Sequence, residues 1–324
     1  MATLNGKTIL ILSPQSWGKM FLSKHHYAVE LAKRGNTVYF LDPPEQGASD
    51  LDKAIDITPL PHAPNLYKIR HKLYFPYALK FHALPLFHAL VRPHLNRVVR
   101  AMGKKPDIIW SFDIGHLYPL GHFKKAECRV FHPVDEPLTR VAIGAARGGQ
   151  IIFSVTREIL EKYHGFDVPR HFINHGVQAD FLLPVNVGAA PGNPIRVGLS
   201  GNLVRPDLDR PTLLQIVAEN PGVVFECWGS YSFRQSNIGG NDDNDTADFI
   251  KALQSHSNVV LHGAIPTGDL AKEIHRMDAF LICYDINKDQ SKGTNYHKIM
   301  EYLSTGKVVI SNTVTTYKDR PGLL

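Results

Sequence analysis

Lys298 and Glu301 lie three residues apart in a segment whose pattern predicts a helix over residues 295–305. Thr294 can cap the first turn of that helix, so that the free amide groups of Asn295 and its neighbours point into the preceding loop. The partial positive charge at a helix amino end favours a phosphate group there. Lys298 can then oppose a diphosphate, while Glu301 can accept hydrogen bonds from two neighbouring hydroxyls. The alternative is an exposed ion pair that contributes little to stability.

A second candidate loop follows a predicted strand over residues 195–199. Gly201 lacks a side chain, so the backbone there can come close to a ligand. Arg205 or Arg210, a few residues further on, can supply a forked, charge-assisted hydrogen bond to a phosphate. The alternative is that both arginines are solvated beside a proline-framed turn. Both loops therefore indicate a site for a phosphate-bearing ligand.

Short apolar strands alternate with helices along the whole chain, which predicts an α/β protein with mainly parallel sheets and helices on both sheet faces. The first 42 residues read as strand, helix and strand, which is a βαβ unit. Strands are expected over residues 8–13, 37–42, 107–112, 129–134, 151–155 and 171–174, and then over 195–199, 223–228, 258–261, 279–284 and 308–311.

The stretch over residues 181–194 is rich in glycine, proline and alanine and has no periodicity, as is typical of a linker. We therefore predict a first domain over residues 1–183, a linker over 184–194 and a second domain over 195–324. Each domain is expected to be Rossmann-like and doubly wound. Open sheets of this kind bind ligands at the carboxyl ends of their strands, so two such domains would face each other across a shared cleft.

Composition places the chain among globular proteins of a reducing compartment. Its 324 residues are 44% hydrophobic and 20% charged, and no segment approaches the roughly 20 apolar residues of a membrane span. The first residues lack the order of a signal peptide. Cys128, Cys227 and Cys283 are widely separated and lie in apolar runs, which suits buried thiols rather than a disulfide or a metal site. We expect a cytoplasmic protein without a metal or a cofactor.

Residues 66–105 include nine lysines and arginines and no acidic residue, and aromatic residues are interspersed among them. An amphipathic helix of this kind can lie on an anionic membrane surface, which would place the protein on the inner face of the membrane. A core-packed helix with a solvated basic face is the alternative. A nucleic-acid partner is not expected, because no stacking motif or groove-reading module accompanies the charge.

The segment over residues 278–312 resembles the nucleotide-sugar-binding segment of glycosyltransferase family 4. The matching residues are Lys298, Glu301, Tyr302, Leu303, Gly306, Lys307 and the strand over 308–310. The resemblance implies a GT-B fold, a UDP- or GDP-sugar donor held by the second domain, and retention of anomeric configuration. Gly293 stands where many members carry a second glutamate, a role that Asp285 or Asp289 would have to take.

The same resemblance implies that the first domain binds the acceptor. Its opening loop and helix match the family's acceptor region at Ser16, Trp17, Gly18 and His25, with Gln15, Lys19 and His26 nearby, although either histidine can be an ordinary helix residue. His132 matches the histidine that the family keeps near the acceptor and the anomeric carbon. Asp135 is a second catalytic candidate, as the base of an inverting enzyme.

These features together predict transfer of a sugar from a nucleoside diphosphate sugar to a glycan or a lipid-linked acceptor, as in the synthesis of envelope polysaccharide or glycolipid. A GT-B sugar-nucleotide epimerase or hydrolase would share the donor site without an acceptor pocket. A bilobed binding protein without catalysis would normally carry an export signal. Because GT-B enzymes usually continue past the strand that matches residues 308–311, we also expect a shortened carboxyl end.

Overall fold

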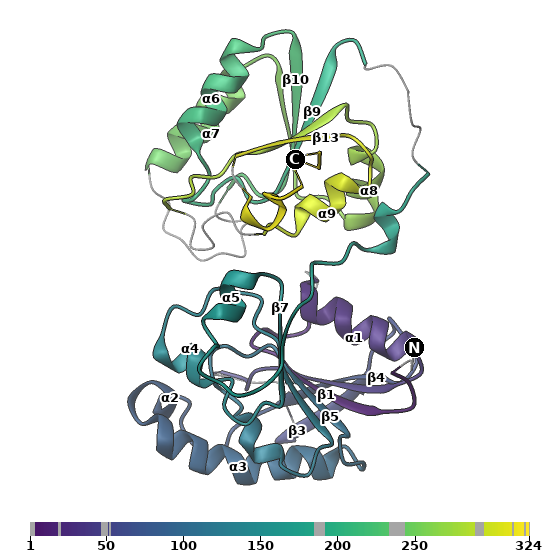
Figure 1. Cartoon of the computed structure of the whole chain (residues 1–324), viewed down its shortest axis with the longest axis vertical. Helices are drawn as coiled ribbons and strands as arrows, with labels where there is room; N and C mark the ends of the chain where they lie inside the picture. Colours follow the sequence, from purple (N-terminus) through teal and green to yellow (C-terminus); the bar gives the residue numbers. More distant parts are fainter. Residues whose placement is uncertain are drawn as a thin grey trace. The chain divides into compact units, whose positions relative to one another are not determined.

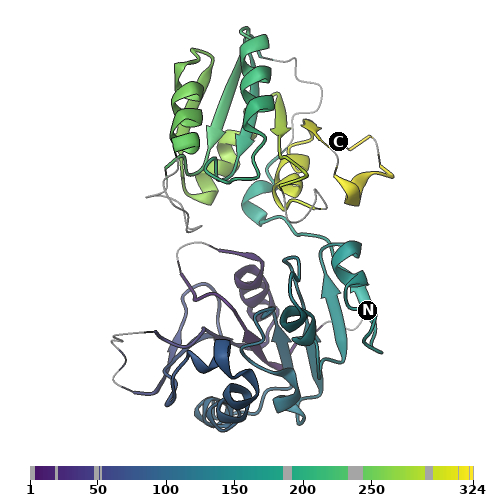
Figure 2. The same ribbon diagram turned by 90° about the vertical axis from the view of Figure 1, so that its left-hand side faces the viewer.

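The computed structural model describes residues 4–18, 21–46, 51, 53–184, 192–232, 244–288, 295–312, 314–320 and 322–323. The chain divides into two compact units, Met1–Asn174 and His175–Leu324. Each unit has helices packed around a largely parallel sheet (Figures 1 and 2). The predicted fold class, two doubly wound α/β domains, is confirmed. None of the helices that the structure describes combines the length and the apolar character of a membrane span.

Unit 1 contains an eight-stranded sheet in the order β3-β4-β2-β1-β5-β6-β7-β8, in which only the β3–β4 pair is antiparallel. The strands are β1 Thr8–Leu12, β2 Thr37–Leu41, β3 Ile55–Pro59, β4 Leu66–His71, β5 Ile108–Ser111, β6 Cys128–Phe131, β7 Ile151–Ser154 and β8 Arg170–Phe172. Sequence analysis missed β3 and β4. The signal for β3 was the alternation of Ile55 and Ile57 with polar neighbours.

Strand β1 shows how the sheet of unit 1 is covered on both faces. Ile9 and Ile11 pack with residues of α1, whereas Leu10 and Leu12 pack with residues of α3, because successive side chains point to opposite faces. The helices are α1 Ser23–Lys33, α2 Leu79–His82, α3 Leu84–Ala101, α4 Arg140–Gly144 and α5 Arg157–Glu161, with a 3-10 turn, η1, over Leu120–Phe123. All five strand residues of β1 are buried, as a central strand requires.

Unit 2 contains a five-stranded sheet in the order β11-β10-β9-β12-β13, and every pair in it is parallel. The strands are β9 Ile195–Ser200, β10 Val223–Trp228, β11 Val259–Gly263, β12 Ala279–Ile282 and β13 Val308–Ser311. The helices are α6 Arg210–Glu219, α7 Asn244–Ser255, α8 Thr267–Ile274 and α9 Lys298–Leu303. Right-handed crossovers put α6 and α7 on one face of the sheet and α8 and α9 on the other (Figure 1).

The division between the units falls before the expected linker. Phe181, in the 3-10 turn η2 (Ala179–Phe181), is buried in the core of unit 2. Its carbonyl oxygen accepts hydrogen bonds from His275 Nε2 at 3.0 Å and from Ser304 Oγ at 3.1 Å. These contacts attach the residues after Asn174 to the second unit. Most of the stretch predicted as a linker, 184–194, lies outside the described residues.

Candidate functional site

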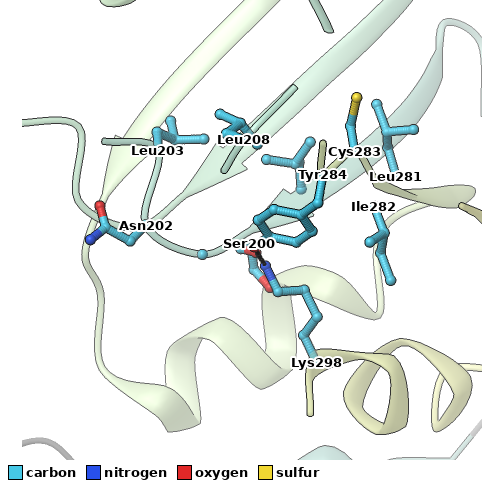
Figure 3. Close-up of a pocket in the computed structure, with 11 residues that line it drawn as sticks. Ser200, Asn202, Leu203, Leu208, Leu281, Ile282, Cys283, Tyr284 and Lys298 are labelled. Atoms are coloured by element: carbon cyan, nitrogen blue, oxygen red, sulfur yellow. Dashed lines mark hydrogen bonds between the residues drawn. The ribbon is translucent and has the colours of Figure 1, made fainter. Parts of the chain in front are cut away.

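The candidate site of unit 2 lies where the strand order of its sheet reverses. From β9 the chain proceeds to β10 and β11 on one side, whereas β12 and β13 lie on the other. A pocket opens here, at the carboxyl ends of β9 and β12 (Figure 3), and it is lined by Leu199, Ser200, Gly201, Asn202, Leu203, Leu208, Leu281, Ile282, Cys283, Tyr284 and Lys298. Ligands of doubly wound proteins bind at such reversal points. The enclosed volume is only about 10 Å³, so a substrate would lie across the loop and not inside the pocket.

Lys298 is the buried cation of this site. Its ammonium group donates hydrogen bonds to the carbonyl oxygen of Ser200 and, over 2.7 Å, to the hydroxyl of Tyr284 (Figure 3). The same nitrogen lies 4.9 Å from the centre of the Tyr284 ring. Burial alone would lower the pKa of Lys298, but the two phenol groups of Tyr284 and Tyr302 outweigh it and the net shift is upward. The side chain therefore carries a positive charge directly under the loop at Gly201.

Gly201 is required at its position for two independent reasons. Its φ of +137° lies in a region that other residues rarely adopt, and an added Cβ would lie 2.4 Å from Lys298 Nζ. Gly229, which follows β10, is equally constrained, because an added Cβ there would lie 1.8 Å from the carbonyl oxygen of Gly201. The two loops after β9 and β10 are thus packed backbone against backbone.

Helix α9 binds the end of β9 through a second residue as well. The hydroxyl of Tyr302 accepts a hydrogen bond from the backbone amide of Ser200 at 2.7 Å and lies 2.9 Å from Ser200 Oγ. The Tyr302 ring is buried and stacks on Phe280 of β12 at a centroid distance of 4.2 Å. Lys298 and Tyr302 therefore fix the helix to the loop that precedes the candidate site. Sequence analysis had matched Tyr302 to the family but had assigned it no contact.

Glu301 is less buried than Lys298 and Tyr302, which lie on the same helix. Of its side chain, 18% is exposed. Burial raises the pKa of its carboxyl group, and the charge of Lys298 opposes that shift. Glu301 Oε1 lies 3.6 Å from Nε2 of His297, an exposed side chain at the start of the helix. The carboxylate is accordingly near the surface and beside the buried cation, where it can accept hydrogen bonds from a ligand.

The start of α9 differs from the sequence expectation. The helix begins at Lys298 and not at Asn295, and its N-cap residue, His297, provides no side-chain hydrogen bond. The preceding residues form a turn, and the Tyr296 ring stacks on Tyr284 at 4.7 Å. That stacking holds residues 295–297 across the end of β12, so the helix begins only at Lys298. The expected cap, Thr294, lies outside the described residues, and Asn295 is buried.

The two arginines of the second candidate loop have separate environments. Arg205 donates from both its Nε, at 2.7 Å, and its Nη2 to the buried carboxylate of Asp207, and its guanidinium lies 5.3 Å from the Tyr284 ring centre. Arg210 donates to Thr246 Oγ1 at 2.7 Å and lies over Phe249, both on α7. The structure therefore brings Arg205 beside the pocket with its charge already paired.

The other expected donor residues are only partly described. Asp285, which was considered as a substitute for the second glutamate, lies 3.6 Å from Lys288 Nζ in an ion pair. Gly293 and Asp289 lie outside the described residues. Tyr284, which contacts Lys298, Arg205 and Tyr296, was missed by sequence analysis. Its position at the carboxyl end of the strand predicted over residues 279–284 was the available signal.

In unit 1, the predicted acceptor residues belong to the loop between β1 and α1. Ser16 and Gly18 are exposed. Trp17 is partly buried: its amide donates to Asp42 Oδ1 at 2.8 Å, and its ring packs edge-on against Phe40 at 4.9 Å. Lys19 lies outside the described residues. The loop thus presents small and polar groups outward and uses its tryptophan as an anchor.

His25 lies under this loop and is buried. Its Nδ1 accepts a hydrogen bond from the amide of Leu22 at 3.0 Å, and its Nε2 lies 3.4 Å from the carbonyl oxygen of Ser16. Burial lowers the pKa of His25 to about 4, so the ring is neutral at pH 7. Both ring nitrogens are therefore engaged with the backbone, which holds the loop against the start of α1.

The two predicted catalytic residues follow β6. His132 is buried and stacks on Phe112 at 4.9 Å, and its Nδ1 accepts a hydrogen bond from the indole of Trp110 at 3.3 Å. Its other ring nitrogen, Nε2, is buried as well. Asp135, three residues further on, is exposed.

Solved structures supply the comparison for this arrangement. The chain is similar to sucrose-phosphate synthase from Thermosynechococcus elongatus, with 13% identity over 97% of this chain and 83% of that one and a TM-score of 0.62. It is also similar to HepE from Anabaena, in complex with UDP and glucose, with 16% identity over 95% and 81% of the two chains and a TM-score of 0.63. The lipopolysaccharide outer core galactosyltransferase WaaB gives 13% identity, 94% and 80% coverage and a TM-score of 0.60.

The fold of this chain is GT-B. No protein-family model matches the chain, and no curated protein matches its sequence. Within the GT-B fold, the segment that resembles family 4 comprises β12, α9 and β13 of unit 2. The pocket therefore lies in the same unit as that resemblance, and β12 and α9 contribute part of its lining.

Proposed function

We propose that this protein is a glycosyltransferase that moves a sugar from a nucleoside diphosphate sugar to an acceptor hydroxyl. One observation carries the proposal: Gly201 and Lys298 lie together at the reversal point of the second sheet of a GT-B fold, and Glu301 lies on the same helix as Lys298. The similar HepE structure contains UDP and glucose, and a trehalose-6-phosphate structure from E. coli contains UDP-2-fluoro glucose. These ligands support a UDP-sugar as the first donor to test, with a GDP-sugar as the alternative.

The donor diphosphate would lie across the loop at Gly201, where no side chain blocks the backbone. The charge of Lys298, held beneath that loop, would stabilise the negative charge that develops on the leaving diphosphate. Glu301 would accept hydrogen bonds from the ribose hydroxyls. Arg205, whose carboxylate partner Asp207 is buried, would contribute to the local field and would need to leave that partner to bind phosphate directly.

We assign the acceptor to unit 1. His132 would hydrogen-bond a sugar hydroxyl near the anomeric carbon through Nε2. The family 4 resemblance supports retention of configuration, in which case no protein base is needed to activate the acceptor. An inverting reaction would instead use Asp135 as the base. Ser16, Trp17, Gly18 and His25 would shape the acceptor loop.

The test is a transfer assay with a panel of UDP- and GDP-sugars and of sugar acceptors, in which release of the nucleoside diphosphate and formation of the glycoside are measured together. A glycosyltransferase releases nucleotide in step with glycoside when the acceptor is present. Epimerised sugar nucleotide, or free sugar released at the same rate without acceptor, would instead establish the epimerase or hydrolase alternative.

We further propose that the protein works at the inner face of an anionic membrane, on a lipid-linked or glycan acceptor. Helix α3 buries Phe87, Val91 and Leu95, so its opposite side faces solvent. At the α2–α3 bend, the side chains of Phe81 and Leu86 are 71% and 51% exposed. Exposed apolar groups within a stretch that lacks acidic residues suit an interface rich in anionic lipid.

A further inference from the structure

Lys24 is a buried cation that makes no ion pair within the described residues. It lies in the first turn of α1, is 3% exposed, and donates a hydrogen bond from Nζ to the side-chain oxygen of Gln15. Across the described residues, no other hydrogen bond and no ion pair to its ammonium group is found. Two of its three N–H donors are therefore not used by the described part of the chain.

Three other buried charged side chains, Lys298, Glu226 and Asp207, have more partners. Lys298 has a carbonyl group, a phenol group and an aromatic face. Glu226 has Arg196 and His262, and Asp207 has Arg205. A buried charge with a single neutral partner is costly, and proteins keep such groups mainly where a ligand or a function completes them.

The position of Lys24 connects it to the predicted acceptor region. The loop between β1 and α1 contains Gln15, which is exposed, and Ser13 fixes the shape of that loop by hydrogen bonds to the amide and carbonyl of Gln15. Burial lowers the pKa of Lys24, and the charge of Asp135, after β6, partly offsets that effect. Lys24 thus lies at the carboxyl edge of the sheet, between the acceptor loop and the candidate catalytic segment.

We propose that Lys24 binds a phosphate group of the acceptor, and that the side chain of Gln15 occupies the place of that phosphate in the free protein. Gln15 is exposed and can move aside, which would free the ammonium group for an anion. Lysine binds phosphate as a compact point charge, and the amide groups in the first turn of α1 add a favourable partial charge. The inference rests on the proposed function, because it names the chemistry of the acceptor.

Two kinds of acceptor carry such a group: a sugar monophosphate and a sugar linked to a polyprenyl diphosphate. The experiment is calorimetric titration of the full chain, without donor, with glucose 6-phosphate, glucose and a short-chain polyprenyl diphosphate sugar. We expect at least one phosphate-bearing compound to bind more tightly than glucose. The compound that binds more tightly identifies the source of the phosphate.

Substitution of Lys24 tests the site itself. Lys24→Met should weaken binding of the phosphate compound by about tenfold or more, and Lys24→Arg should restore part of it. Lys33→Met, on the exposed end of the same helix and paired with Glu30, is the matched control and should bind like the wild type. Because Lys24→Met removes an uncompensated buried charge, its thermal midpoint should equal or exceed that of the wild type.

Two results would overturn the inference: equal binding of glucose and of the phosphate compounds by the wild type, or unchanged phosphate binding by Lys24→Met. A lowered thermal midpoint together with unchanged binding would show that Lys24 serves the structure only. Phosphate binding by a protein that transfers no sugar would refute the proposed function and leave this site intact. Transfer to a neutral sugar with an unchanged KM in Lys24→Met would support the proposed function and refute the phosphate site at Lys24.

Discussion

At the residue scale, the candidate donor site depends on a lysine that is buried because a glycine makes room for it. Lys298 Nζ occupies the space that a side chain at position 201 would need. The charge is stabilised by a carbonyl oxygen and a phenol hydroxyl, and not by a carboxylate. A cation held in this way is only partly neutralised, so its field extends to the loop above it.

Gly201→Ala tests this arrangement. The new methyl group would meet Lys298 Nζ, and the backbone would be forced to keep a φ of +137°. We expect a loss of about 1–3 kcal/mol in the free energy of unfolding and a clear loss of nucleotide affinity, measured by urea unfolding and by titration. Gly222→Ala is the control, because open space surrounds Gly222. Equal behaviour of the two variants would contradict the account.

Asp42 provides a pH-dependent prediction. Burial raises the pKa of its carboxyl group to about 6, although the amide of Trp17 and the charges of Lys68 and Arg70 act in the opposite direction. Its ordinary pKa is 3.8. Between these two pH values the folded protein therefore binds more protons than the unfolded chain. The contribution of Asp42 to the free energy of unfolding is full below about pH 4 and is lost as the pH rises through about 6.

Asp42→Asn should therefore gain about 3 kcal/mol of unfolding free energy relative to the wild type between pH 4 and pH 7. The measurement is urea unfolding of both proteins at several pH values. Asp167→Asn, at an exposed position of the same unit, controls for the change in net charge. Parallel pH profiles for Asp42→Asn and the wild type would contradict the assignment.

At the element scale, α9 holds the candidate site together. It is only six residues long, and its buried residues Lys298, Ile299 and Tyr302 all face inward. Short helices have little stability of their own, so α9 depends on these tertiary contacts. Two side chains of α9 hydrogen-bond to Ser200: Lys298 through its ammonium group and Tyr302 through its hydroxyl.

Tyr302→Phe removes that attachment and keeps the ring that stacks on Phe280. The buried amide of Ser200 then loses its partner, which should cost about 1–3 kcal/mol of unfolding free energy. Chemical unfolding of Tyr302→Phe and of the control Tyr231→Phe, at a partly exposed position of the same unit, measures the difference. A cost no larger than that of the control would mean that the hydroxyl does not secure the helix.

We predict that the bend between α2 and α3 contacts an anionic membrane. Phe81→Asp should weaken binding to vesicles that contain phosphatidylglycerol by about tenfold, because a buried phenylalanine contributes about 1.5–3 kcal/mol. Co-sedimentation with these vesicles and with neutral phosphatidylcholine vesicles is the measurement. Leu138→Asp has the same charge change at another exposed apolar position of unit 1. Equal loss in both variants, or equal binding to both kinds of vesicle, would refute a docking role for this bend.

Most elements could be predicted from the sequence because buried parallel strands are apolar runs, as in β1 and β12. The exceptions arose where a tertiary contact decided the structure. Because Tyr296 stacks on Tyr284, α9 begins later in the sequence than predicted. Because Phe181 is buried in the core of unit 2, η2 belongs to that unit. The motif placed Lys298 and Glu301 on one helix, but it did not predict the burial of Lys298 under the loop at Gly201, because that burial depends on the register of α9 against β9.

At the scale of the whole molecule, the GT-B fold is kept at 10–16% identity to the solved structures that the chain resembles. Residues with candidate roles lie at the carboxyl ends of strands in both units: Gly201 and Tyr284 in one, His132 in the other. This distribution follows from the fold, because the remaining parts of each parallel sheet are covered by helices.

The most direct test of the donor site is titration of the full chain with UDP, GDP and their sugar conjugates, for the wild type and for Glu301→Ala. Glu219→Ala, at the exposed far end of α6, is the control. We expect one nucleoside diphosphate to bind the wild type and the control equally, and to bind Glu301→Ala about tenfold or more weakly, since charge-assisted hydrogen bonds contribute about 1.5–3 kcal/mol. Binding that does not change in Glu301→Ala, or the failure of every nucleotide to bind the wild type, would contradict the account.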